Sequence, residues 1–238
     1  MRIADHARMT VFALLIALAA APASAASPRF TNIMPHGGQR GTEVDVTLYG
    51  TNLQDAEEVL VYDPGLEVVS FAHPEDEKQK GRQLKVRFRL AENAPLGSQR
   101  LRIRTRTGLS ELQNFHVGAL PVVMEAEPNT QFDAPQVIEK NVTVHGRVDR
   151  EDVDYYVVEC KKGERLGVEV FGLRLGYAST SSSFFDPSIA IIDENRFELA
   201  TEDDSALVGN DSVASVVIPE DGKYYVQIRD AAYGGDGR

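Results

Sequence analysis

Short segments in which apolar and polar residues alternate recur along the chain from Arg29 onward. The clearest is TEVDVTLYG, residues 42–50, in which Val44, Val46 and Leu48 share one side of an extended chain. A period of two is typical of a half-buried strand, and no helical period is sustained over the same region. The chain is therefore predicted to be all-β.

Two further alternating segments, residues 83–90 and 99–106, flank the turn-forming sequence ENAPLG. If they pair as a hairpin, seven cations share one sheet surface: Lys85, Arg87, Arg89, Arg100, Arg102, Arg104 and Arg106. One interpretation is a patch that binds a polyanion. The other, which charge patterning favours, is that nearby acids neutralise the cations as cross-strand pairs, namely Glu43, Asp45, Glu57 and Glu58.

The second half of the chain has strand-like runs of its own, each bounded by Gly, Pro, Asn, Asp or Ser. They are VTVHGRV, VDYYVVE, RLGVEVFGL, PSIAIID, SVASVVI and KYYVQIRD. Short strands at such spacing predict a second antiparallel sandwich or jelly roll. Adjacent tyrosines in two of these runs predict one buried and one exposed ring in each strand.

Length and charge agree with two domains. The 238 residues suffice for two ordinary domains. Of the formal net charge of −11, residues 121–238 contribute −12 and residues 1–120 contribute +1, so the two halves differ chemically. This acidity argues against a nucleic-acid partner.

The N-terminus has the features of a Sec-type signal peptide over residues 1–25. Arg2 and Arg8 precede an apolar run over residues 11–21, and small residues follow up to a cleavage site before Ala26. The alternative, a membrane anchor, needs roughly 20 apolar residues, and the run is shorter. We therefore expect export to the periplasm, the cell surface or the extracellular space, with no transmembrane segment in the mature chain.

The sequence PHGGQRGTEVDVTLYGTNL, residues 35–53, resembles the opening of an immunoglobulin-like IPT/TIG domain. That pattern combines a proline, spaced glycines, alternating valines and Gly-x-Asn-Leu. Gly38 and Gly41 are expected to shape the turn into the strand, and Gly50 with Asn52 suits a bulge or positive φ at its exit. The resemblance implies an immunoglobulin-like sandwich over residues 26–118 that serves as a spacer or binding module.

The region 119–238 resembles the bacterial pre-peptidase C-terminal domain. The resemblance is carried by Glu127-Pro128-Asn129, Gly146, DREDVDYYVV, KKGERLGVEV, Asp186-Pro187, TEDDS, GNDS and PEDGKYYVQIRD. It implies an accessory, non-catalytic, calcium-associated β-sandwich. The family pattern continues past YGGDGR into one more strand, so this domain is expected to be truncated at its C-terminal strand and the chain to be a fragment.

The stretch MEAEPNTQF places Glu125, Glu127 and Asn129 at alternate positions. It is a solvated linker, a catalytic carboxylate pair or part of a cage for calcium, which takes six to eight oxygen ligands. In a straight strand, Glu125 and Asn129 lie roughly 13 Å apart, too far to share one ion. A metal site therefore requires the segment to curl or to serve two ions.

The resemblance decides among these alternatives. Collagen-binding members of the family use an E-x-E-x-N segment as calcium ligands, which matches Glu125, Glu127 and Asn129, and complete the cage with aspartates that match Asp152 and Asp154. Charge patterning alone favours a solvated linker. The resemblance implies instead a structural calcium ion whose binding adds to the free energy of folding.

No residue is predicted to be catalytic. The mature histidines, His36, His73, His116 and His145, have no paired spacing. Cys160, the only cysteine, forms no intrachain disulfide and is predicted to be buried and inert.

The sequence therefore predicts two consecutive β-sandwich domains, immunoglobulin-like and then jelly-roll-like, after a signal peptide. Together they would form an exported, non-catalytic, calcium-stabilised binding or adhesion module whose partner is an extracellular polymer, protein or polysaccharide. The alternative is the accessory targeting region of a secreted peptidase or hydrolase whose catalytic domain lies outside this chain.

Overall fold

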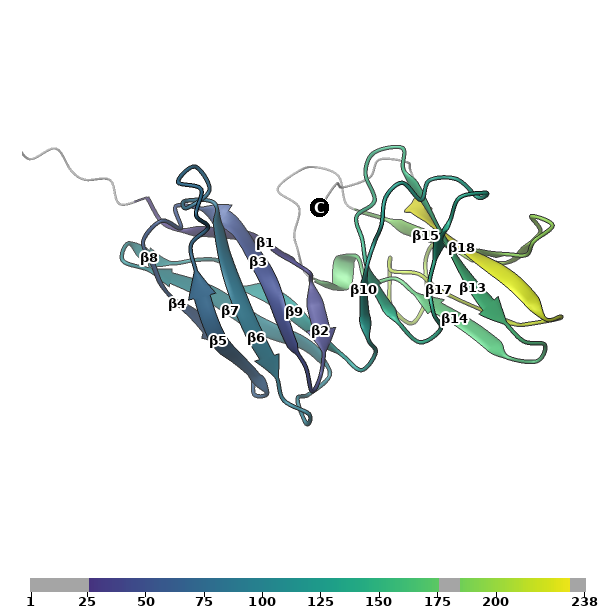
Figure 1. Cartoon of the computed structure of the whole chain (residues 1–238), viewed down its shortest axis with the longest axis horizontal. Helices are drawn as coiled ribbons and strands as arrows, with labels where there is room; N and C mark the ends of the chain where they lie inside the picture. Colours follow the sequence, from purple (N-terminus) through teal and green to yellow (C-terminus); the bar gives the residue numbers. More distant parts are fainter. Residues whose placement is uncertain (1–25, 176–184, 232–238) are drawn as a thin grey trace, which may run out of the picture.

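The computed structural model describes residues 26–175 and 185–231, which form two β-rich bodies side by side (Figure 1). The proposed signal peptide lies outside these residues. The described elements are strands β1 to β18 and one short 3-10 helix, η1 (Leu173–Leu175), which confirms the all-β prediction. In the described ranges, no helix has the length and apolar character to cross a membrane.

The first body is a sandwich of two sheets with strand orders β1-β3-β6-β5 and β2-β9-β7-β4, and β8 also pairs with β7. In immunoglobulin lettering these orders read A-B-E-D and A′-G-F-C, so the predicted immunoglobulin-like architecture is confirmed. The bounds are β1 (Arg29–Met34), β2 (Gly37–Gln39), β3 (Glu43–Thr51), β4 (Ala56–Val61), β5 (Leu66–Ala72), β6 (Gln83–Leu90), β7 (Gly97–Thr105), β8 (Gly108–Leu109) and β9 (Gln113–Gly118).

The inward side chains of the alternating segments fill the core between these sheets. Leu48, Phe88 and Phe115 are fully buried, and the rings of Phe88 and Phe115 lie 5.3 Å apart between centroids. Of the four positions expected to shape the ends of β3, Gly41 and Asn52 have positive φ, 81° and 59°, whereas Gly38 and Gly50 lie within β2 and β3 without it. Local turn chemistry and strand periodicity therefore agree with the fold.

The structure does not pair residues 83–90 with residues 99–106. β6 belongs to one sheet and β7 to the other, so the seven cations do not share a surface. Acids on or next to neighbouring strands form ion pairs with five of the seven, namely Arg87 with Asp45, Arg89 with Glu43 and Glu67, Arg100 with Asp63, Arg104 with Glu57 and Glu58, and Arg106 with Asp55. The single polyanion patch loses its structural basis, and cross-strand pairing holds for most of these cations.

The second body contains a five-stranded sheet of order β11-β13-β18-β15-β16, a pair β14-β17 and a parallel pair β10-β12. The bounds are β10 (Val122–Met124), β11 (Gln136–Val137), β12 (Thr143–His145), β13 (Val153–Cys160), β14 (Arg165–Glu169), β15 (Pro187–Ile192), β16 (Glu198–Glu202), β17 (Val213–Val217) and β18 (Gly222–Asp230). The additional strand predicted to follow YGGDGR lies outside the described residues.

The core of this second sandwich lies between β14-β17 and the large sheet. Tyr156 and Tyr224 are buried, whereas their neighbours Tyr155 and Tyr225 lie half-buried on the outer face, as the adjacent pairs predict. Cys160 is a buried free cysteine, also as predicted. The alternation of apolar and polar residues therefore identified which side chains of β13 and β18 point inward.

The first core predicts a clear contrast between two leucines. Replacing fully buried Leu48 by alanine should lower the free energy of unfolding by about 2–5 kcal/mol, because a cavity remains. Leu96→Ala, at a side chain that is 53% exposed, should stay within about 0.5 kcal/mol of wild type. Urea unfolding measures both. Equal losses in the two variants would contradict this core assignment.

Candidate metal centre

The segment after β10 bridges two strands of the second domain. At one end, the backbone N–H of Glu125 donates to the carbonyl of His145, which extends the β10-β12 pairing (2.9 Å). At the other end, the carbonyl of Asn129 accepts from the backbone N–H of Tyr155 on β13 (2.9 Å). The segment is thus anchored on both sides within five residues.

An aromatic cluster holds the chain just beyond this segment. The ring of Phe132 stacks on Tyr225 with centroids 4.0 Å apart and meets Tyr155 edge-on at 5.9 Å. The Arg196 guanidinium covers the other side of Phe132 at 4.4 Å and forms an ion pair with Asp133 (2.8 Å). These contacts keep the segment against the outer face of the large sheet.

Three carboxylates converge inside the resulting bend. Oxygen atoms of Glu125, Glu127 and Asp154 all lie within 4.8 Å of one another. The amide Nδ2 of Asn129 lies 3.2 Å from Glu125 Oε1. The segment therefore curls, as a single metal site requires, and doesn't run straight.

Neighbouring groups hold the two glutamates in place. Glu125 accepts from the backbone N–H of Arg147 (2.8 Å) and from the hydroxyl of Tyr156. Glu127 accepts from the backbone N–H of Asn129 (3.0 Å). Gly146 leaves room for the Glu125 carboxylate, because a Cβ atom there would lie 2.7 Å from Oε1.

Two oxygens at this site are buried without a hydrogen-bond partner. They are Oδ1 of Asn129 and Oδ1 of Asp154, whose residues are 0% and 1% exposed. An unsatisfied buried oxygen costs free energy, more so on a charged group. A cation bound among the three carboxylates would satisfy the Asp154 oxygen.

The electrostatics point the same way. Burial, together with the charges of Glu125, Asp152 and Glu127, raises the pKa of Asp154 to about 8. Burial and the hydrogen bond to Glu125 also raise the pKa of the Tyr156 hydroxyl, which therefore stays a donor. Without a cation, Asp154 keeps its proton at neutral pH; with one, it becomes an anionic ligand.

The donor set fits calcium. All-oxygen ligation by carboxylates and an amide is what this hard cation takes, at 2.3–2.6 Å per bond. Glu125, Glu127, Asn129 and Asp154 would hold it, and its charge would offset the repulsion among the three carboxylates. The remaining ligands of a six- to eight-coordinate ion would be water or backbone oxygen.

Asp152, the fifth predicted ligand, is engaged differently. Its carboxylate accepts from the backbone N–H groups of Asp149 (3.3 Å) and Val153 (2.9 Å). It lies in the turn that precedes β13 and is not one of the three converging carboxylates. Its charge still contributes to the raised pKa of Asp154.

The sequence interpretation did not assign Tyr156 or Gly146 to the site, although Gly146 is part of the family pattern; both shape the Glu125 side of the site. A signal for Tyr156 was present, because it stands two residues after Asp154 and so shares its side of the strand. The contact of Gly146 with Glu125 joins segments about twenty residues apart. No local pattern indicates it.

Residues 152–230 match the sequence family described as the bacterial pre-peptidase C-terminal domain. This match covers the larger part of the second domain. The matched range includes Asp154 but begins after residues 125–129, so the pre-peptidase C-terminal match contains one wall of the carboxylate cluster. No curated protein matches the sequence.

Solved structures give distant similarities only. SGBP-B of the Bacteroides ovatus mixed-linkage glucan utilization locus, in complex with a mixed-linkage heptasaccharide, is 8% identical with a TM-score of 0.28, over 82% of this chain and 71% of that chain. SGBP-B from a complex xyloglucan utilization locus in Bacteroides uniformis is 11% identical with a TM-score of 0.30, over 85% of this chain and 67% of that chain. The Yersinia pseudotuberculosis adhesin InvE is 12% identical with a TM-score of 0.25, over 89% of this chain and 53% of that chain. TM-scores this low do not establish a common overall arrangement.

Replacing Asp154 by asparagine should abolish the effect of calcium on the melting temperature without destabilising the calcium-free protein. Asp154→Asn places a neutral side chain where the calcium-free protein holds a protonated carboxyl group, so the variant should melt near the wild-type temperature in chelator at neutral pH, and added calcium should no longer raise its melting temperature. Glu159→Gln, which removes an exposed carboxylate from the same strand, should keep the wild-type response. Thermal melts with calcium and with chelator measure this. A calcium response retained by Asp154→Asn would exclude Asp154 as a ligand.

The raised pKa of Asp154 makes the calcium effect depend on pH. Between about pH 4 and pH 8 the folded, calcium-free protein holds a proton that the unfolded chain has lost, so its stability falls as pH rises through this range. Calcium replaces that proton. The increase in melting temperature on adding calcium should therefore be larger near pH 8.5 than near pH 6. An equal increase at both pH values would show that Asp154 does not exchange a proton for the ion.

Proposed function

We propose that this chain is an exported, non-catalytic binding or adhesion module that acts at the cell envelope or in the extracellular space, with calcium stabilising its second domain. The observation that carries the proposal is the convergence of Glu125, Glu127 and Asp154, together with the unsatisfied buried oxygens of Asp154 and Asn129. In this view the ion has a structural role, because the carboxylates it would bind belong to the segment that anchors the start of the second domain.

The size of the calcium effect follows from linkage. At a free calcium concentration 100 times the dissociation constant, binding to the folded state alone adds about 2.7 kcal/mol. For a domain of this size that corresponds to a rise in melting temperature of roughly 10 °C or more. Such a contribution is a large fraction of the stability of an ordinary domain.

The proposed partner is an extracellular polymer, protein or polysaccharide. The first domain, for which we propose an IPT/TIG-type identity, would act as a spacer or a second binding surface. On the second domain, the half-buried rings of Tyr155, Tyr225 and Phe132 on the outer sheet face support a contact with an extended chain. The proposal assigns no catalytic role to the carboxylates, which are held by backbone and side-chain donors around a cation site.

A second candidate function is the accessory targeting region of a secreted peptidase or hydrolase whose catalytic domain lies outside this chain. The match of residues 152–230 to the pre-peptidase C-terminal domain favours it. Both candidates share the binding role and differ only in what is delivered to the polymer.

Co-sedimentation with insoluble polymers tests the shared role. Residues 26–238 should be retained by at least one member of a panel of fibrous proteins and polysaccharides, and Asp154→Asn should weaken retention at temperatures where its calcium-free second domain is partly unfolded. Glu159→Gln should be retained like wild type. Failure to bind any polymer, or turnover of a panel member that is lost in Glu127→Gln, would overturn the non-catalytic binding proposal.

A further inference from the structure

Three of the four mature histidines meet where the two domains join. His36 lies between β1 and β2 and His116 lies on β9, both in the first domain, whereas His145 ends β12 in the second. The rings of His36 and His145 stack across the boundary, with centroids 6.3 Å apart and planes 20° apart. All three line a cavity of about 700 Å³ that extends into the second domain.

The same boundary contains a second ring contact. The ring of His116 packs against Phe171 of the second domain, with centroids 4.8 Å apart. The Arg174 guanidinium covers Phe171 at 4.0 Å. The amide Nδ2 of Asn114 donates across the boundary to the carbonyl of Leu175 (3.2 Å). The short helix η1 is therefore the part of the second domain that rests on β9.

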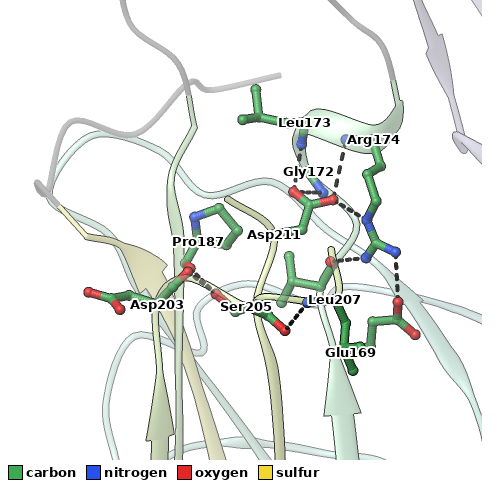
Figure 2. A network of polar contacts seen from close by, with 11 residues as sticks. Glu169, Gly172, Leu173, Arg174, Pro187, Asp203, Ser205, Leu207 and Asp211 are labelled. Carbon is green, nitrogen blue, oxygen red and sulfur yellow. Dashed lines mark hydrogen bonds and ion pairs between the residues drawn. The ribbon is translucent and has the colours of Figure 1, made fainter. Parts of the chain in front are cut away.

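A buried aspartate fixes η1 in this position. Asp211, which is fully buried, accepts from the backbone N–H groups of Gly172 (3.1 Å) and Leu173 (2.8 Å) and from Arg174 Nε (2.6 Å), while Arg174 also pairs with Glu169 (2.8 Å) (Figure 2). The surface that meets His116 is thus held rigidly from within the second domain. The histidine contacts, by contrast, depend on ring packing.

Burial at the boundary between the domains favours the uncharged form of the three histidine rings. His36 is only 7% exposed. Burial and then the neighbouring His145 lower the pKa of His36 to about 4. The pKa of His116 is lowered by burial and by Arg174, against a smaller opposite effect of Glu169. Burial and then His116 also lower the pKa of His145 to about 4.

The two charged side chains described next to the His116 ring largely offset each other. From the second domain, η1 contributes Arg174, which repels a positive ring, and β14 contributes Glu169, which Arg174 already neutralises. His36 Nε2 lies 3.2 Å from Oδ1 of Asn32, within its own domain. The other charged residues that line the cavity are of both signs: Glu139, Lys140, Arg147, Asp154 and Arg165. Protonating two or three adjacent rings here would place like charges side by side in a desolvated space.

We propose that this histidine cluster makes the contact between the domains sensitive to acid: protonation of His36 and His116 separates the domains, so the module is stiff near neutral pH and hinged in acid. Docking should weaken as the pH falls, because the state with the domains in contact binds fewer protons than the state with the domains separated. Docking is complete above the ordinary histidine pKa of 6.5 and weakens as pH falls from there towards about 4.

Small-angle scattering of residues 26–238, combined with the ring 15N shifts of the histidines, tests this proposal. The radius of gyration and the maximum dimension should increase between about pH 7.5 and about pH 4.5, in step with protonation of His36 and His116. Circular dichroism must show both domains folded at each pH. The expansion should occur in excess calcium and equally in chelator, which separates it from any loss of a bound ion.

Variants complete the test. Two double variants remove the charge that His36 and His116 acquire in acid. One carries His36→Gln and His116→Gln, and the other carries His36→Phe and His116→Phe. Either double variant, if it is as compact as wild type near pH 7.5, should remain compact in acid. His73→Gln, which removes the mature histidine outside the cluster, should expand like wild type. The proposal is overturned if the wild type keeps its dimensions while His36 and His116 take up protons, or if a compact pair expands in acid as wild type does.

Discussion

Mutual repulsion among three carboxylates, at the point where the chain enters the second sandwich, is the constraint around which this structure is arranged. Glu125, Glu127 and Asp154 come within 4.8 Å of one another, and Asp154 is buried among them. Such an arrangement is expensive for three anions in a desolvated space. It becomes favourable when one of them is protonated or when a cation occupies the centre, and the protein has groups suited to either state.

The surrounding contacts make sense as a frame for that centre. The Tyr156 hydroxyl and the backbone of Arg147 orient Glu125, and the ring of Phe132 holds the following chain on the sheet. Because Glu125 also continues the β10-β12 pairing, an ion there would tighten the strand that leads out of the first domain. Next to this strand, His145 reaches the domain boundary, so the cation site and the histidine cluster are neighbours on one short element.

Much of the fold could be predicted from the sequence, since alternation of apolar residues reports which side chains face inward. It does not report which strands pair, and the hairpin considered for residues 83–90 and 99–106 does not form, because the chain crosses from one sheet to the other at their connection. At the site, Glu125, Glu127, Asn129 and Asp154 come together as the family resemblance implied. Asp152 does not join them, because strand alternation begins only at Val153 and its carboxylate serves the preceding turn.

Other features depend on tertiary packing, and no local sequence pattern indicates them. The histidine cluster draws on three distant segments, and nothing in the spacing of His36, His116 and His145 distinguishes them from surface residues. The fixed position of η1 similarly depends on Asp211, nearly forty residues further along the chain. Contacts of this kind are set by how the sandwiches close and not by the pattern of any one strand.

Calorimetric titration of the calcium-free protein with calcium, repeated near pH 7 in buffers of different ionisation enthalpy, tests the central claim most directly. The account predicts binding of calcium with release of roughly one proton for each ion bound, because Asp154 gives up its proton to become a ligand. Absence of binding heat in every buffer, or binding without proton release, would contradict it.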